Sequence, residues 1–160
     1  MEIEKAIRQK KFKDPYERVL VNLLYTSSRL EYKQTCVFKN FGLSMQQYNI
    51  LRILKGRFPE PITVNMLIER MIDKSSNASR IVEKLRTKGF LERKICPEDR
   101  RRVDIFITDK GAEVLAEATA ALYRMHDDWR NLTDEEADTL NALLTKLREK
   151  ETTESEKQTK

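Results

Sequence analysis

Residues 73–111 of the chain, DKSSNASRIVEKLRTKGFLERKICPEDRRRVDIFITDKG, decide its fold. Apolar residues at positions 78, 81, 82 and 85 have the spacing of a helix with one buried face, and Gly89 follows where such a helix should stop. Two runs of alternating residues, 91–96 and 103–107, flank an arginine-rich segment and predict a β-hairpin. A shorter helix should come first, because Thr63 precedes apolar positions 64, 67, 68 and 71. Two short helices followed by a hairpin predict a winged helix-turn-helix.

Helix-start patterns organise the rest of the chain. A capping residue opens a predicted helix at Asp14, Ser44, Thr108 and Thr133. The first of these helices should run from about residue 15 to 40, with a shorter helical piece before it. Asp73 or Ser75 is the predicted N-cap of the helix that stops at Gly89. The predicted fold class is therefore mainly α with a small β-hairpin wing.

Positive charge is concentrated in one part of the chain. Residues 70–102 contain eleven basic and five acidic residues, a net charge of +6, whereas the whole chain carries +5. The remaining residues therefore sum to −1. This concentration predicts a surface that binds a polyanion, with a solvated charged face as the alternative.

The helix predicted for about residues 75–88 has the features of a DNA-recognition helix. Its polar face begins with small side chains, which can approach base edges in the major groove without a steric clash. The backbone N–H groups at its start also favour a nearby phosphate. The candidate DNA contacts are Lys74, Ser75, Ser76, Asn77, Ser79, Arg80 and Lys84. Alternatives are an N-cap role alone for Ser75 and simple solvation for Lys84 and Lys88.

The tip of the hairpin supplies the second group of candidates. It contains Arg100, Arg101 and Arg102, and arginine suits the negative potential of a narrow minor groove. Asp99 precedes them, and its carboxylate can pair with a nearby guanidinium and orient it. We expect Arg101 to enter the groove and Arg100 to contact phosphate or stabilise the wing, and Arg102 stays open. An arginine-rich loop without fixed geometry is the alternative.

The same residues resemble the winged-helix core of the MarR family of bacterial transcription regulators. The matching features are the helix S-R-I-V-E-K-L-R-x-K-G, the D-R-R of the wing tip and the T-D-K-G that opens the next helix. The family's Asp-x-Arg wing pattern falls on Asp99 and Arg101. The resemblance extends over nearly the whole chain. It implies a homodimeric repressor that binds a pseudopalindromic site in double-stranded DNA and releases it when a small, often aromatic, ligand binds.

The resemblance also implies a domain organisation. One domain would cover residues 1–150, with the winged helix-turn-helix at about 44–108 and dimerisation helices within 1–42 and 109–150. The helix expected at 15–40 carries apolar residues on more than one face, which also suggests a partner chain. Residues 151–160 lack apolar side chains and are predicted to form a disordered polar tail.

Three kinds of sensor can be considered. A redox sensor needs a reactive cysteine, but the peroxide sensors of the family carry theirs near the start of the first long helix. Cys36 lies near the end of that helix and Cys96 on a wing strand. The lone His126 has no ligand cluster around it in the sequence, so no metal or other cofactor is expected. An organic ligand remains the default, and the candidate pocket residues, for which core packing is the alternative, are Tyr25, Tyr32, Phe38, Phe41 and Tyr48.

Other functions find little support in the sequence. It shows no phosphate-binding glycine loop, Cys/His pair or nucleophile elbow, so no enzyme is expected. The alternatives to a DNA-binding regulator are a winged-helix protein-interaction module and a thiol-based repressor that uses Cys36. The N-terminal residues have no apolar core of a secretory signal, and the two cysteines are far apart, so a reducing cytoplasm is expected.

Overall fold

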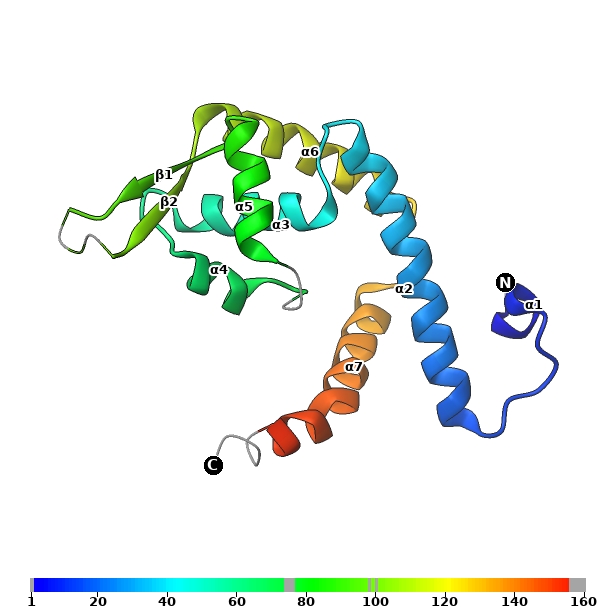
Figure 1. Ribbon diagram of the computed structural model, residues 1–160. Helices are drawn as coiled ribbons and strands as arrows, with labels where there is room; N and C mark the ends of the chain where they lie inside the picture. The colour runs from blue at the N-terminus through cyan, green and yellow to red at the C-terminus, as the bar shows by residue number, and fades with distance from the viewer. Residues whose placement is uncertain (1, 74–76, 98, 100, 156–160) are drawn as a thin grey trace. The chain divides into compact units, whose positions relative to one another are not determined.

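The computed structural model describes residues 2–73, 77–97, 99 and 101–155, and the side chains among them up to residue 149. The protein is mainly helical with one two-stranded antiparallel hairpin, which confirms the predicted fold class (Figure 1). In chain order the elements are α1 (Ile3–Ile7), α2 (Pro15–Lys39), α3 (Met45–Arg57), α4 (Val64–Arg70), α5 (Ala78–Thr87), β1 (Leu91–Ile95), β2 (Val103–Ile107), α6 (Asp109–Asp127) and α7 (Asp134–Ser155). Residues 1–125 and 126–160 form two compact units, which are described separately.

The predicted capping residues open their helices through side-chain hydrogen bonds. The Asp14 carboxylate accepts from the Glu17 N–H at 2.8 Å, with Pro15 in the first turn of α2. Ser44 and Gln47 form both bonds of a capping box at the start of α3. The Thr63 hydroxyl accepts from the Met66 N–H and opens α4. These starts are confirmed because each cap satisfies an N–H that the helix itself leaves unpaired.

The predicted start of α5 is wrong. This helix begins at Ala78, and its N-cap is Asn77, whose side-chain oxygen accepts from the Arg80 N–H at 3.0 Å. Asparagine caps a helix as well as aspartate or serine does, so Asp73, Ser75 and Asn77 were equivalent by residue type. The predicted stop is confirmed, because Gly89 has a φ of 74° and the Phe90 N–H donates to the Leu85 carbonyl as α5 ends.

The hairpin forms in the predicted place. β1 and β2 pair in an antiparallel register from Leu91 opposite Ile107 to Ile95 opposite Val103. Ile62, from the loop before α4, joins the other edge of β2 by two backbone hydrogen bonds with Ile105, at 3.2 and 2.9 Å. The base of the hairpin is thereby attached to the helical part of the winged helix-turn-helix.

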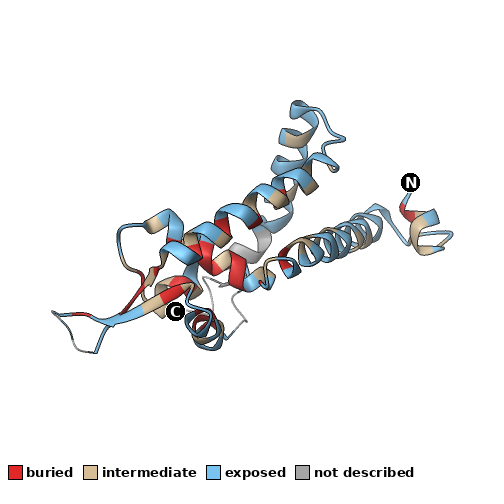
Figure 2. Ribbon diagram, turned by 90° about the horizontal axis from the view of Figure 1, so that it is seen from above, coloured by how far each residue is buried: buried red, intermediate tan, exposed pale blue. Residues whose placement is uncertain are grey.

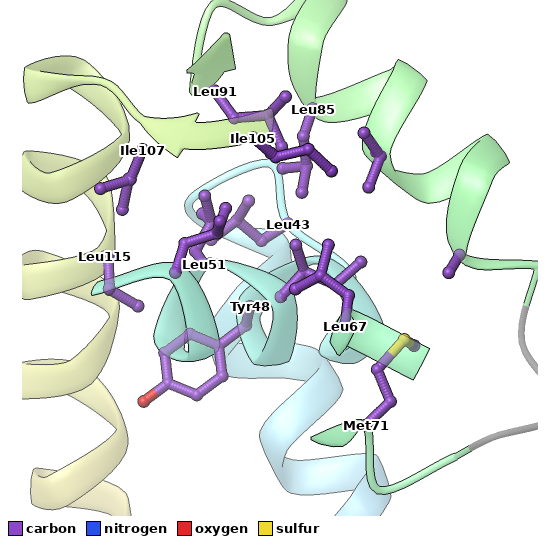
Figure 3. Packing of buried hydrophobic residues seen from close by; sticks show 14 of the residues in the cluster. Leu43, Tyr48, Leu51, Leu67, Met71, Leu85, Leu91, Ile105, Ile107 and Leu115 are labelled. Atoms are coloured by element: carbon purple, nitrogen blue, oxygen red, sulfur yellow. The ribbon is translucent and has the colours of Figure 1, made fainter. Parts of the chain in front are cut away.

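One hydrophobic core lies among α3, α4, α5, the hairpin and α6 (Figure 3). Leu51, Leu67, Leu85 and Ile105 are completely buried there. In Figure 2 the long helix after the N-terminal turn, α2, is exposed along most of its length, and Phe38 is its one buried residue among those described. The core therefore fixes the winged helix-turn-helix and leaves most of α2 uncovered.

The start of α6 packs directly against the end of α5. The Thr108 hydroxyl accepts from the Gly111 N–H at 3.1 Å and donates to the Gly89 carbonyl at 2.7 Å. A Cβ atom on Gly111 would lie 2.0 Å from the Phe90 carbonyl oxygen, so only glycine fits this approach. The predicted opening of this helix at Thr108 is confirmed.

The second unit contains α7. Thr133 and Glu136 exchange the two hydrogen bonds of a capping box, as predicted. The helix runs to Ser155, five residues into the segment 151–160 that was expected to be disordered. For residues 156–160, which lie outside the described residues, the tail stays a prediction, as does the single domain over 1–150. No helix in the described part of the chain is long and apolar enough to cross a membrane.

Candidate nucleic-acid interface

The exposed face of α5 carries three of the predicted DNA contacts. Ser79, Arg80 and Lys84 are exposed, whereas the opposite face buries Ala78 and Val82 in the core. No ion pair of Arg80 or Lys84 occurs among the described residues, so their charges face solvent. Asn77 is exposed too, but its side-chain oxygen is used as the N-cap. The predicted contacts Lys74, Ser75 and Ser76 lie outside the described residues.

Glu83 connects α5 with the wing. Its carboxylate accepts three hydrogen bonds from the Arg86 guanidinium, the shortest at 2.7 Å, and lies 3.8 Å from an Arg93 nitrogen on β1. The hydrogen bonds from Arg86 and the charges of Arg86 and Arg93 hold the pKa of Glu83 below its ordinary value. The hydrogen bonds to the Glu83 carboxylate, and its negative charge, raise the pKa of Arg86. Two basic residues of the segment 70–102 are thus partly neutralised within the protein.

Asp99 organises the wing tip through the backbone. Its carboxylate accepts from the Arg101 N–H at 3.0 Å, and its carbonyl accepts from the Arg102 N–H at 2.9 Å. This is a turn closed by an aspartate side chain. The described residues show no ion pair between Asp99 and the Arg101 guanidinium, which is the contact that the sequence had suggested. Asp99 therefore fixes the backbone of Arg101, whereas the Arg101 side chain itself is exposed.

The contact of Arg102 was not predicted. Its Nε donates to the Asp104 carboxylate at 3.1 Å, and Asp104 is one of the two buried polar residues of the described chain. The two residues are two positions apart at the start of β2, a spacing that places side chains on one face of a strand. That spacing is the signal which could have revealed the pair. Arg100, the other predicted contact of the tip, lies outside the described residues.

A hollow of about 400 Å³ lies between the start of α4 and the wing. Three arginines contribute to its wall against a single carboxylate, so the wall is basic. Its lining residues are Thr63, Val64, Asn65, Arg93, Asp99, Arg101, Arg102 and Val103. The wing and the helix-turn-helix therefore enclose a concave positive surface, which suits the phosphates of a nucleic acid.

Comparisons with known proteins agree with this geometry. The model of the MarR family matches residues 41–102. The uncharacterized HTH-type transcriptional regulator YkoM of Bacillus subtilis is 30% identical over 113 residues, which are 68% of this chain and 70% of YkoM. The chain belongs to the MarR family. It is a DNA-binding transcription regulator, and this assignment is favoured over a protein-interaction module or a thiol-based repressor that uses Cys36.

Two further similarities cover most of the chain. The transcriptional repressor MprA of Escherichia coli is 27% identical over 136 residues, which are 83% of this chain and 77% of MprA. The crystal structure of an organohalide-sensing transcriptional regulator in its 2,4-dichlorophenol-bound form has a TM-score of 0.75 and 22% sequence identity. It covers 88% of this chain and 85% of its own. That second likeness shows that the fold is shared well beyond the residues of the family match.

The five aromatic residues predicted to line an effector pocket are not brought together. Phe38 and Tyr48 are buried and stacked on each other, with ring centroids 4.3 Å apart, and the Tyr48 hydroxyl is 3.1 Å from that of Thr119. Phe41 packs against the same core. Tyr25 and Tyr32 lie on α2 outside that core, and Tyr32 is 70% exposed. The structure therefore places three of the five, Phe38, Phe41 and Tyr48, in core packing.

The structure also shows the surroundings of the two cysteines and of His126, the residues considered for redox and metal sensing. Cys36 is exposed on α2, and Cys96 is buried just after β1. Burial does not suit Cys96 to react with an oxidant. Among the described residues no group of three or more metal-binding side chains occurs, and His126 belongs to none.

Proposed function

We propose that this MarR-family protein is a homodimeric repressor that binds a pseudopalindromic operator through α5 and the wing. The observation that carries the proposal is the exposure of Arg80, Lys84 and Arg101 on two elements that share one core. Other basic residues of the segment, Arg86, Arg93 and Arg102, contact acidic side chains. Arg80, Lys84 and Arg101 are exposed and form no ion pair among the described residues, so their charges are available to DNA.

A DNA titration tests this proposal. Duplexes are selected from the intergenic DNA next to the gene, and binding is measured at several salt concentrations. Arg80→Ala and Arg101→Ala should each weaken operator binding by about 1–3 kcal/mol. Arg148→Ala, which removes the same charge from α7, is the matched control and should bind like the wild type. Unchanged operator binding in both Arg80→Ala and Arg101→Ala would remove these residues from the interface.

The proposed dimer rests on apolar side chains that the described chain leaves uncovered. Tyr16, Val19, Leu20 and Leu24 form a stripe along the first turns of α2, and each is at least half exposed. Leu140, Leu143 and Leu147 form a similar stripe on α7. Exposed apolar surfaces of this kind mark protein interfaces. A second copy of the chain is the proposed partner.

Sedimentation tests the dimer directly. Leu24→Glu places a charge in the stripe and should shift the protein to a monomer that binds the operator weakly. Asn22→Glu adds the same charge on the opposite face of α2 and should leave the dimer intact. A Leu24→Glu protein that stays dimeric would exclude the α2 stripe as the interface.

We also propose that a small aromatic effector releases the protein from DNA. The support is the fold likeness to a regulator bound to 2,4-dichlorophenol, together with the exposed ring of Tyr32. Screening phenolic compounds for release of the bound duplex tests this, and Tyr32→Leu should weaken the response. The proposal places the protein in the cytoplasm, where it would reach chromosomal DNA, and assigns it no catalytic activity.

A further inference from the structure

Lys88 is the C-cap of α5, and its exposed side chain reaches the turn between α2 and α3. Its ammonium donates to the Gly42 carbonyl and, at 3.3 Å, to the Gln47 side-chain oxygen. Gly42 belongs to the turn that ends α2, and Gln47 lies in the first turn of α3. One side chain therefore joins the ends of three helices.

The acceptors of Lys88 are polar but uncharged. The Gln47 side chain is buried and also accepts from the Ser44 N–H at 3.1 Å, so Lys88 extends the capping box of α3. The Gly42 carbonyl lies at the C-terminal end of α2, where the helix dipole is negative and favours a cation. Both contacts explain why a lysine charge is stable here without an acidic partner among the described residues.

The same end of α5 is also attached to α6. The Lys110 ammonium donates to the Lys88 carbonyl at 3.2 Å, and the Thr108 hydroxyl donates to the Gly89 carbonyl at 2.7 Å. In Figure 1 the C-terminal end of α5 lies beside the start of α6. The end of α5 away from Ser79 and Arg80 is thus fixed on two sides.

We infer that Lys88 is a positioning residue for DNA recognition, which fixes the direction of α5 relative to α2 and α3. This inference rests on the proposed operator binding. Lys84, one turn earlier on α5, is the contrasting case, because its exposed ammonium is available to a phosphate. The two lysines lie on one helix four residues apart, yet they would serve DNA binding in different ways.

Geometry shows why the far end of the helix matters. α5 has ten residues, so it is about 15 Å long at 1.5 Å per residue. A rotation of about 4° at its fixed end moves the other end by about 1 Å. Hydrogen bonds to base edges tolerate a displacement of only a few tenths of an ångström, whereas the attraction of a positive charge to phosphate falls off slowly with distance. Removal of the Lys88 hydrogen bonds should therefore reduce specific binding more than non-specific binding.

The test compares Lys88→Met with Lys84→Met and Lys88→Arg. Each variant is titrated with the selected operator duplex and with an unrelated duplex over a range of salt. Lys88→Met should weaken operator binding about fivefold to tenfold while the unrelated duplex and the salt slope stay unchanged. Lys84→Met should weaken both duplexes and reduce the salt slope by about 0.9 for each phosphate that the protein no longer neutralises. Lys88→Arg keeps a donor and should restore most of the affinity.

Several outcomes would overturn the inference. Operator binding by Lys88→Met that equals the wild type would show that Lys88 positions nothing. A reduced salt slope would make Lys88 a phosphate contact, and an equal loss on both duplexes with a lower melting temperature would make it merely structural. If the wild-type protein binds every selected duplex no more tightly than the unrelated duplex, the proposed function fails. The inference then fails as well.

Discussion

Replacing Gly111 by alanine sets two opposing effects against each other. Alanine stabilises a helix relative to glycine by up to about 1 kcal/mol. The new Cβ atom, however, would lie 2.0 Å from the Phe90 carbonyl oxygen and 3.0 Å from a side-chain carbon of Ile107. Since Cβ atoms keep at least 3.0 Å from other heavy atoms, α6 and the Phe90 carbonyl must separate by about 1 Å.

This separation determines the sign of the change in stability. Overpacking of a fitted site costs about 1–3 kcal/mol. The Phe90 carbonyl also accepts from the Thr108 N–H at 3.2 Å, and a displaced carbonyl weakens that bond. We therefore expect Gly111→Ala to lower the free energy of unfolding by about 2 kcal/mol, which corresponds to a melting temperature lower by about 4–8 °C.

Thermal and urea unfolding measure the effect, and Gly56 supplies a matched control. A Cβ atom on Gly56, within α3, would meet no atom within 4 Å. Gly56→Ala should therefore raise stability by about 0.5–1 kcal/mol, because only the helix preference remains. A Gly111→Ala protein at least as stable as the wild type would refute the close-approach reasoning.

Variants at three further positions test the wing and the core. Glu83→Gln should be less stable than the wild type near neutral pH. The difference should disappear as the pH falls through the Glu83 pKa, which the arginine contacts lower below its ordinary 4.5. Melting curves at several pH values measure this difference. Leu85→Ala removes a completely buried side chain and should cost about 2–5 kcal/mol in urea unfolding. Asp99→Ala should weaken operator binding because it removes the acceptor of the Arg101 N–H, whereas Asp99→Asn keeps an acceptor and should bind normally. Equal losses for both Asp99 variants would show that its charge, and not this bond, matters.

Local patterns predicted most of the fold. Capping at Asp14, Ser44, Thr63 and Thr133 depends on residues three positions apart, and these helix starts were correct. The start of α5 was wrong because several adjacent residues can cap a helix equally well. Ala78 is buried, as its spacing predicted, and it is also the first residue of α5, so Asn77 is the cap. The apolar spacing alone does not show whether the helix begins there or a turn earlier.

The candidate site was predicted less completely than the fold. Exposure of Arg80 and Arg101 followed from the helix face and the turn. Lys88 lies 46 positions from Gly42 and 41 positions from Gln47, so no local pattern predicts these contacts. Asp99 was expected to pair with the Arg101 guanidinium, but its carboxylate accepts from the Arg101 N–H, because an aspartate in a turn readily bonds a backbone N–H two residues away.

The attachment of Ile62 to β2 has a consequence for solubility. It covers one edge of the hairpin, so that within the described chain the outer edge of β1 is the open one. Open strand edges can pair with other chains and lead to aggregation. β1 is only five residues long, and its three central residues, Glu92, Arg93 and Lys94, are all charged. Short length and charge both discourage such pairing, so the wing can extend from the protein without recruiting strands from its neighbours.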